Sequence, residues 1–191
     1  FTLVFIIHSI SASHFENFRV EQIRMGKIDY FLTRPFSYIS EVLCGHIAGK
    51  LFYMTISLPF FFVLLKGLEA YLALQLPVFT TLSLVSFLLM LFFATMVEFL
   101  FALIVVLLGF WFEGSDGLEH FKWISISLLS GWLIPIEMMP EWLKNITLAL
   151  PFKYMYAIPI ETAIYQRAIT TVDILIMGGC VGSLLLISSL L

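Results

Sequence analysis

The residue types in this chain that could form a metal or catalytic site are four histidines and two cysteines. The histidines fall on separate predicted elements, with no carboxylate or cysteine at metal-ligand spacing, so we expect them in the core or at an interface. The cysteines lie inside apolar runs without C-x-x-C spacing, which indicates neither a disulfide nor a metal site. No nucleophile, base and orienting group can be assembled. We therefore expect no covalent chemistry, metal or cofactor in the chain itself; these residues are His8, His14, His46, His120, Cys44 and Cys180.

A glycine-lysine run at residues 45–50, GHIAGK, superficially resembles a phosphate-binding loop. Its spacing is one residue short, and Leu51 stands where a metal-binding Ser or Thr is required. The net charge of −3 and the lack of a long basic run give no reason to expect a nucleic-acid partner. We therefore expect no nucleotide site in this run and no nucleic-acid partner.

One carboxylate, Glu98, lies between two uncharged runs at residues 76–97 and 99–112. A carboxylate at bilayer depth costs roughly 2.5 to 3.5 kcal/mol on insertion scales. Glu98 is therefore expected to face the bundle interior, a partner chain or a water-filled path. Its simplest role is that of a protonated group hydrogen-bonded to a neighbouring helix.

The composition places these residues in a membrane protein. Hydrophobic residues make up 61% of the 191 and charged residues 12%, whereas soluble domains carry about 25% charge. We expect an all-α, polytopic transmembrane helical bundle. The chain begins and ends inside apolar runs, which indicates a fragment of a longer protein.

Four apolar stretches are expected to cross the membrane in full, after a partial span at residues 1–10. Lys50 should reach back to the headgroups from the start of the first full span. Residues 78–112 are predicted to form one long tilted helix, although two crossings are barely possible by length. The expected elements are an interfacial segment at 36–50, spans at 51–68, 78–112 and 118–136, and a last span from residue 174 onward. The span at 118–136 is expected to be irregular, because Lys122 lies near its start and Gly131 and Pro135 near its end.

The most polar stretch, residues 13–35, is expected to hold a helix outside the bilayer. Ser13 and Glu16 have the spacing of a capping box, which would start the helix. Gly26 is expected to end it and Pro35 to stop a second short turn. This loop holds four basic residues against three in residues 137–171, which favours it as the cytoplasmic one.

The faces of this predicted helix differ. Charges occupy one side together with Val20 and Ile23, whose side chains would offer a small apolar spot to a partner. The other side could lie on a membrane surface, and its residues are Phe15, Phe18, Gln22 and Met25. An ordinary connecting helix with no partner is the alternative.

Residues 137–171 are divided by prolines into pieces too short to cross. One piece is predicted to be an amphipathic interfacial helix with Glu141, Lys144 and Thr147 on its polar side. Its apolar face, with Trp142 at headgroup depth, comprises Trp142, Leu143, Ile146, Ala149 and Leu150.

Two runs in order suggest a family: QIRMGKIDYFLTRP at residues 22–35 and LSGWLIPIEMMPEWLKNITLALPF at residues 129–152. Together they resemble the permease subunits of bacterial ABC exporters of the ABC-2 type, in particular the viologen-exporter-like subgroup. The matching positions are Ile23, Arg24, Gly26, Asp29, Leu32 and Pro35, then Ser130, Gly131, Pro135, Pro140 and Trp142.

The resemblance implies a six-span permease of the bacterial inner membrane, here without its first span and most of its second. It implies that residues 13–35 couple to a separate ATP-binding subunit, which binds the ATP, and that residues 137–171 re-enter or rest on the outer leaflet. Two permeases, identical or paired with a sister, would join two ATPase copies. The implied coupling residues are Glu21, Ile23, Arg24, Gly26, Lys27 and Asp29, and the re-entrant motif comprises Gly131, Pro135, Pro140, Trp142 and Pro151.

The substrate type implied by this subgroup is a lipophilic cation, and Glu98 is then a candidate for the substrate path. Two other classes stay open. A secondary transporter should show repeated halves with interrupted helices, and a membrane enzyme should show clustered histidines or carboxylates; neither pattern is evident. A membrane assembly protein of the same fold would differ mainly in lacking a transported substrate.

Overall fold

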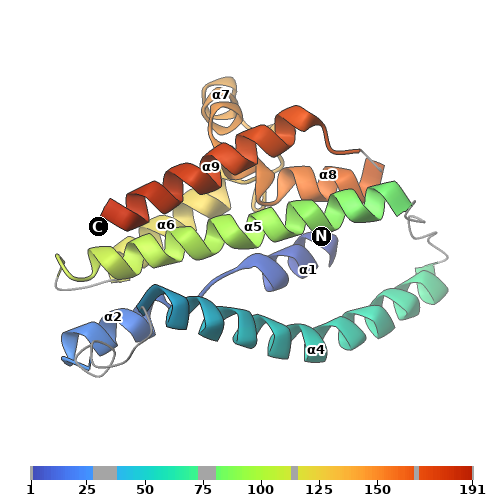
Figure 1. The fold of residues 1–191 in the computed structure, drawn as a ribbon. Coiled ribbons are helices and arrows are strands. Elements are labelled where there is room, and N and C mark those ends of the chain that lie inside the picture. Colours follow the sequence, from blue (N-terminus) through green and yellow to red (C-terminus); the bar gives the residue numbers. More distant parts are fainter. Residues whose placement is uncertain (1, 28–37, 73–80, 113–115, 166–167, 191) are drawn as a thin grey trace.

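The protein is all-α in the part of the chain that the computed structural model describes, which is residues 2–27, 38–72, 81–112, 116–165 and 168–190 (Figure 1). Within these ranges, three helices are long and apolar enough to cross a membrane, over Tyr38–Leu64, Ser83–Leu108 and Thr171–Leu190. The elements are α1 Thr2–Ser11, α2 Glu16–Arg24, α4 Tyr38–Leu72, α5 Thr81–Leu108, α6 Asp116–Leu129, η1 Ile136–Met138, α7 Glu141–Ala149, η2 Pro151–Tyr154, α8 Ala157–Tyr165 and α9 Thr171–Leu190. The expected helical membrane fold is confirmed.

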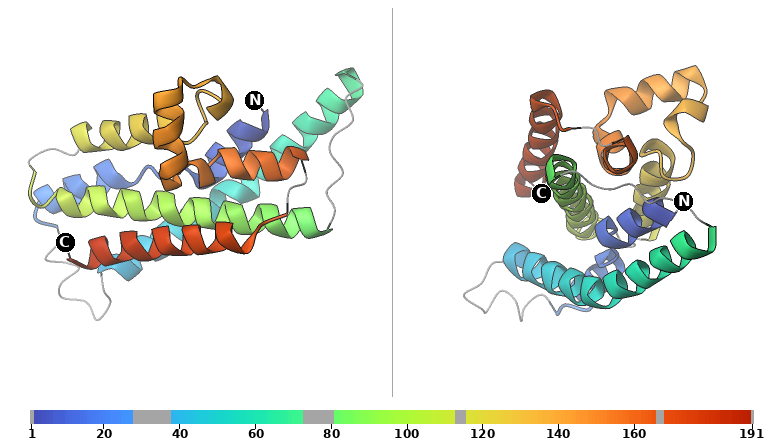
Figure 2. Two further views of the ribbon diagram at one scale, coloured as in Figure 1. Left: turned by 90° about the horizontal axis from the view of Figure 1, so that it is seen from above. Right: turned by 90° about the vertical axis from the view of Figure 1, so that its right-hand side faces the viewer.

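Helix α5 is the centre of the bundle. Its 28 residues contain no Gly or Pro, so nothing interrupts the helix before Gly109. It contacts α1 and α2 on one side and α6, α8 and α9 on the others (Figures 1 and 2). Half of its membrane window is buried within the chain, against 22% for α9 and 6% for α4. The prediction of one long helix in this region is confirmed over residues 81–108.

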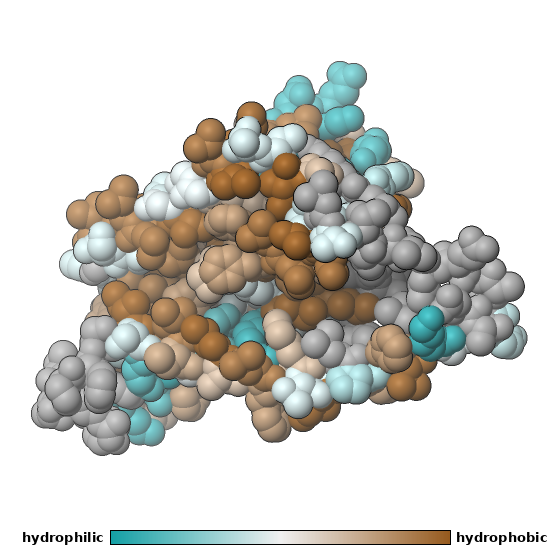
Figure 3. Space-filling model, turned by 45° about the vertical axis from the view of Figure 1, so that its right-hand side comes forward, coloured by the Kyte–Doolittle hydropathy of each residue, from teal (hydrophilic) through white to brown (hydrophobic). Residues whose placement is uncertain are grey.

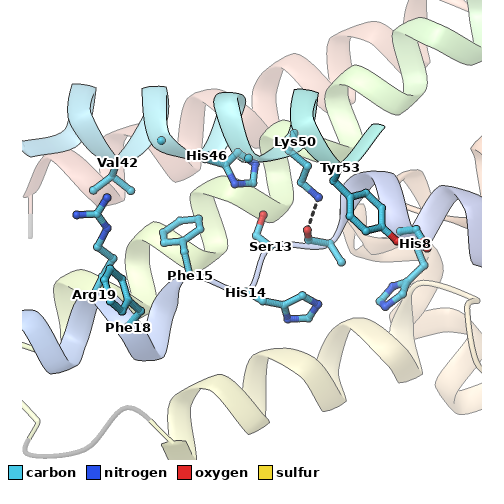
Figure 4. A pocket seen from close by; sticks show the side chains of 14 residues that line it. His8, Ser13, His14, Phe15, Phe18, Arg19, Val42, His46, Lys50 and Tyr53 are labelled. Atoms are coloured by element: carbon cyan, nitrogen blue, oxygen red, sulfur yellow. Dashed lines mark hydrogen bonds between the residues drawn. The ribbon is translucent and has the colours of Figure 1, made fainter. Parts of the chain in front are cut away.

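Helix α4 runs without a break from Tyr38 to Leu72, with Pro59 inside it. The expected division into an interfacial piece and a separate span, 36–50 and 51–68, is therefore wrong. Of the polar residues that suggested the division, His46 and Lys50 point at the link between α1 and α2 (Figure 4), and Glu41 pairs with Arg19 of α2. A proline is tolerated inside a membrane helix where neighbouring groups satisfy the freed carbonyl.

Helix α6 ends at Leu129 after 14 residues, about 21 Å at 1.5 Å per residue, which is short of the roughly 30 Å of a bilayer core. The irregular span expected over 118–136 is thus wrong, because the helix covers only its first part. Gly131 stops the helix with a φ of +80°, which favours glycine. A Cβ at this position would lie 3.2 Å from Ala157 and Ile136. The Ala157 amide then donates to the Ser130 carbonyl at 3.2 Å, so α8 begins where α6 ends.

The segment between α6 and α9 consists of short helices separated by prolines. Pro135 and Pro140 precede η1 and α7, and Pro151 stands in the first turn of η2. Helix α7 buries Leu143 and Thr147 and exposes 66% of Trp142. The assignment of Thr147 to the polar side is wrong, because its hydroxyl packs 3.6 Å from the Met139 sulfur.

The surface of the molecule is mostly apolar in the view of Figure 3, with hydrophilic residues in a hollow between two apolar parts. Large apolar side chains are exposed along α4 and α9, including Phe52 at 71% and Leu175 at 75%. An exposed apolar surface of this kind suits contact with lipid or with another membrane chain.

Candidate functional site

The link between α1 and α2 does not form the expected capping box. Helix α2 begins at Glu16 with Phe15 as its N-cap, and no side chain caps it. The Ser13 hydroxyl is buried and has no hydrogen-bond partner among the described residues. The reason is that the Glu16 side chain turns away from its own backbone and binds a lysine on α6.

That lysine, Lys122, forms the centre of a buried cluster that we call the charged core: Glu16, Glu98, Lys122 and Tyr156. The Lys122 ammonium binds the Glu16 carboxylate and donates to the Ser13 carbonyl at 2.9 Å. Its Nζ also lies 4.0 Å from Oε2 of Glu98. The exposed fractions of Glu16, Glu98 and Lys122 are 0%, 3% and 6%. Glu98 therefore faces the bundle interior, as expected.

Tyr156 extends the charged core to the start of α8. Its hydroxyl donates to the Glu98 carboxylate at 3.1 Å and accepts a hydrogen bond from Ser11 at 3.2 Å. The same oxygen lies 3.1 Å from Nδ1 of His8. Burial and the Glu98 charge raise the pKa of Tyr156, so the phenol keeps its proton and acts as a donor.

The charged core joins segments that are far apart in the sequence. Glu16 and Lys122 are 106 positions apart, and Glu98 and Tyr156 are 58 apart. Removing one partner of such a buried pair leaves an uncompensated charge and costs about 3–5 kcal/mol. The cluster therefore holds the start of α2, the middle of α5, α6 and the start of α8 in one fixed arrangement.

Helix α2 has one side in the bundle and one side outside it. Glu16 and Val20 are buried, four residues apart on one face. Val20 packs so closely on the end of α5 that a Cβ at Gly109 would lie 2.6 Å from it. The expectation that Val20 is an apolar spot on the outer face is wrong, because α5 already covers this side chain. Ile23 is half-buried.

The end of α2 is the glycine cap that the sequence predicts. Gly26 has a φ of +68°, its amide donates to the Ile23 carbonyl at 3.0 Å, and the Lys27 amide donates to the Gln22 carbonyl at 3.0 Å. This pair of bonds is the Schellman motif. The cap leaves Glu21, Arg24, Gly26 and Lys27 exposed, whereas Asp29 lies outside the described residues.

Arg19 ties α2 to α4. Its guanidinium lies 3.2 Å from the Glu41 carboxylate, and its side chain is 12% exposed. This ion pair closes one end of a cavity of about 540 Å³ between α4 and the link from α1 to α2 (Figure 4). His8, His14 and His46 all line this cavity, although they lie on separate elements.

Lys50 also lines the cavity instead of reaching the headgroups. Its ammonium donates to the Ala12 carbonyl across the space between α4 and the link (Figure 4). The expectation that Lys50 snorkels outward is therefore wrong. The GHIAGK run that contains it is part of α4, so its glycines form no phosphate-binding loop.

The space beside Glu98 is much smaller. It measures about 10 Å³ and touches Lys122, Trp123 and Trp132. A volume of this size holds about one water at most. The Glu98 carboxylate therefore contacts Tyr156 and Lys122 and does not line the larger cavity.

The residues of the re-entrant motif do not gather at one point. Gly131 packs against Ala157 at the junction of α6 and α8, whereas Pro135, Pro140 and Trp142 are exposed. Beyond this motif, η2 leads to Tyr156, which reaches the middle of α5. The chain thus returns to the centre of the bundle between α6 and α9; its depth in a bilayer stays a prediction.

The sequence matches a family model along its whole length. The model is that of the ABC-2 family transporter proteins, and the match covers residues 1–191. The chain belongs to this family. No curated protein and no solved structure matches it.

As an ABC-2 family protein, the chain is a membrane permease of an ABC transporter, a transport subunit rather than an enzyme. The family implies association with an ABC ATP-binding subunit and with the membrane. The similarity to the viologen-exporter-like subgroup stays a prediction.

Sequence reasoning did not predict that the residues of the charged core, or those that line the cavity, come together in this permease. It treated Lys122 as an irregularity of a span and the histidines as scattered. One signal was present for the cavity: Val42, His46 and Lys50 recur at intervals of four on α4, with Tyr53 three residues further on, and this spacing places them on one face. The Glu16–Lys122 pair has no comparable local signal.

Proposed function

We propose that this permease is the membrane subunit of a bacterial inner-membrane exporter whose ATP is hydrolysed by a separate subunit docked on α2. The observation that supports this is that α2 is buried on one side and exposed on the other. Its inner side is bound to the bundle, and its outer side carries exposed charges. A helix of this kind can receive a displacement on one side and transmit it on the other.

The inner side provides the transmission. Glu16 is held by Lys122 of α6, and Val20 lies against the end of α5. Because packed cores shift between discrete arrangements rather than deform continuously, a movement of α2 would displace Lys122. Lys122 in turn lies beside Glu98, and Glu98 is bound by Tyr156, so the displacement would pass to these two residues next.

The outer side provides the docking surface. Asn17, Glu21 and Arg24 recur along one exposed face, and Lys27 follows the Gly26 cap. Phe18 and Met25 are 61% and 56% exposed beside them. Charged residues with an apolar neighbour are suited to a partner groove, and the partner of the proposal is the ATP-binding subunit.

The permease is proposed to act as a pair, with a second copy or a sister chain. Only 6% of the membrane window of α4 is buried within the chain. Packing of another permease would cover part of this surface, with lipid covering the rest. The lipophilic-cation substrate and the path through Glu98, which the family resemblance implied, are tested against the alternatives below with a Glu98→Gln variant.

The docking proposal is tested at Gly26. No heavy atom lies within 4 Å of a Cβ built there, so a substitution acts through the backbone and not through a clash. Gly26→Val should strain the positive φ by about 1 kcal/mol or more, whereas Gly26→Asn tolerates this conformation. The measurement is ATP hydrolysis by the partner ATPase co-reconstituted with the permease in proteoliposomes, together with its co-purification.

We expect Gly26→Val to lose stimulation and co-purification, and Gly26→Asn to retain both. A charge reversal, Arg24→Glu, should weaken docking with no loss of permease stability, because Arg24 is exposed. Lys144→Glu on α7 is the matched control. Wild-type ATP hydrolysis with Gly26→Val and Arg24→Glu, at equal insertion, would refute docking at α2.

A further inference from the structure

We propose that the cavity between α4 and the α1–α2 link binds an amphiphile with a single anionic headgroup, and that this is the class of molecule the permease exports. The assignment as cargo rests on the proposed export function; the binding itself does not. The shared chemistry is a carboxylate, sulfonate or phosphate attached to an apolar body.

The shape and the walls of the cavity suit a small amphiphile. Its volume of about 540 Å³ falls in the ordinary range of ligand pockets, about 300–1,000 Å³. Phe15, Phe18 and Tyr53 supply aromatic walls (Figure 4). Because Phe18 and Tyr53 are 61% and 45% exposed, the cavity opens at the surface of the bundle.

The charge of the lining selects an anion. The lining contains Lys50 and Arg19 and no carboxylate. Arg19 is paired with Glu41 at 3.2 Å, which leaves Lys50 as the cation with unused capacity. An ammonium has three donors, and within the described residues the Lys50 ammonium donates to one acceptor, the Ala12 carbonyl. A headgroup oxygen can take a second donor.

The same arrangement disfavours a cation in this cavity. The buried Glu98 carboxylate is engaged by Tyr156 and lies 4.0 Å from Lys122. It borders the space of about 10 Å³, which shares the wall formed by His8, Ala12, Ser13 and His14 with the larger cavity, but Glu98 does not line the larger cavity itself. A cationic ligand beside Lys50 would therefore meet like charge, and no carboxylate lines the cavity to offset it.

Two glycines on α4 allow the cavity to be filled without strain. Gly49 lines it, and no heavy atom lies within 4 Å of a Cβ built there. A leucine at this position would occupy the cavity. Gly67, on the same helix and away from the cavity, also has nothing within 4 Å and gives a matched control.

The test uses three probes with the same fluorescent body: dansyl-undecanoic acid, its methyl ester and a trimethylammonium analogue. The full chain is reconstituted in nanodiscs of phosphatidylcholine, and binding is followed by energy transfer from tryptophan to dansyl. Trp132 stacks on His8, a residue of the cavity wall, with ring centroids 4.4 Å apart. This places an energy donor beside the site.

We expect the acid to bind at least about tenfold more tightly than the ester or the cation, because a charge-assisted hydrogen bond is worth more than a neutral one. Lys50→Gln should abolish this preference and leave ester binding unchanged, while Lys66→Gln on the same helix should leave both unchanged. Gly49→Leu should weaken all three probes, and Gly67→Leu none.

Equal binding of the acid and the cation, or an unchanged preference in Lys50→Gln, would overturn the proposed site. Phosphatidylglycerol added to the nanodiscs identifies the source of the anion. Competition by this lipid with no ATP-dependent export of the acid would make the occupant a membrane lipid and overturn the assignment as cargo. ATP-dependent export that is lost in Lys50→Gln supports it.

This experiment separates the two proposals. Binding in nanodiscs needs no ATPase, so a failure of docking at α2 leaves the probe preference intact. Conversely, a cavity that binds no anion leaves the ATPase stimulation measured for Gly26→Val unaffected.

Discussion

Two segments of this permease carry the same local pattern and use it differently. Ser13 lies before α2 and Glu16 begins it, and Thr170 lies before α9 with Asp173 in its first turn; each pair places a hydroxyl three residues before a carboxylate. Around α9 the box forms: the Thr170 amide donates to Asp173 at 3.1 Å, and the Asp173 amide donates to the Thr170 hydroxyl at 3.3 Å. Before α2 neither bond forms.

The difference lies in the neighbours. A buried lysine stands beside Glu16, and leaving that lysine without its carboxylate would cost about 3–5 kcal/mol, against about 1 kcal/mol for a lost helix cap. The carboxylate of Glu16 therefore leaves its own backbone and binds Lys122. At α9 the Asp173 carboxylate stays on the cap, where it accepts from the Thr170 amide and hydroxyl. A local motif thus stabilises its helix only where tertiary packing leaves its side chains available.

The largest expected loss of stability comes from removing Lys122, the residue that draws Glu16 away from the helix cap. Lys122→Met should leave Glu16, which is 0% exposed, as an uncompensated buried charge, at a cost of about 3–5 kcal/mol. The double variant Glu16→Gln/Lys122→Met should recover most of this loss, because no charge then remains unpaired between the two. The measurement is the midpoint of unfolding in mixed micelles as the fraction of dodecyl sulfate increases. A wild-type midpoint for Lys122→Met would refute the charged core.

A smaller effect is expected at the second carboxylate. Glu98→Gln keeps an oxygen that can accept from Tyr156 but removes the charge 4.0 Å from Lys122. We expect a loss of about 1–2 kcal/mol, the difference between a charged and a neutral acceptor. Export of cationic and neutral dyes at matched expression should stay equal to wild type. Selective loss of the cationic dye would contradict this structural role and favour Glu98 as a cation site.

Removing the cap that forms at α9 should cost less stability than either of the two substitutions above. Thr170→Ala removes the hydroxyl that caps the first turn of α9, and the expected loss is about 1 kcal/mol. The unfolding midpoint in the same micelles checks this value, and Thr170→Ser, which keeps the hydroxyl, is the control. If Thr170→Ala and Thr170→Ser unfold at the same midpoint, the box contributes nothing.

The smallest effect is expected when the hydroxyl is removed at Ser13, because the capping box before α2 does not form. Ser13→Ala removes a buried hydroxyl that has no partner among the described residues, so stability should stay within about 0.5 kcal/mol of wild type or rise slightly. The pair Thr170→Ala and Ser13→Ala tests the comparison directly. A loss of about 1 kcal/mol at both sites would mean that Ser13 caps α2 after all.

The sequence by itself determined features that depend on neighbours along the chain. The long α5 follows from an apolar run without Gly or Pro, the cap at Gly26 from the need for a positive φ, and the short pieces after α6 from Pro135, Pro140 and Pro151. The permease family follows from two motifs in order, each of which has a local structural role. Periodicity could also have placed His46 and Lys50 on one face of α4.

Only the tertiary structure decided which charges meet. Lys122 binds a residue 106 positions away, Tyr156 reaches Glu98 across 58 positions, and Lys50 turns inward to the Ala12 carbonyl. A sequence pattern indicates which face of a helix a residue occupies, but the partner on the opposite face depends on how α1, α4, α5 and α6 pack. In an apolar bundle each buried charge needs a partner, and packing alone brings these partners together.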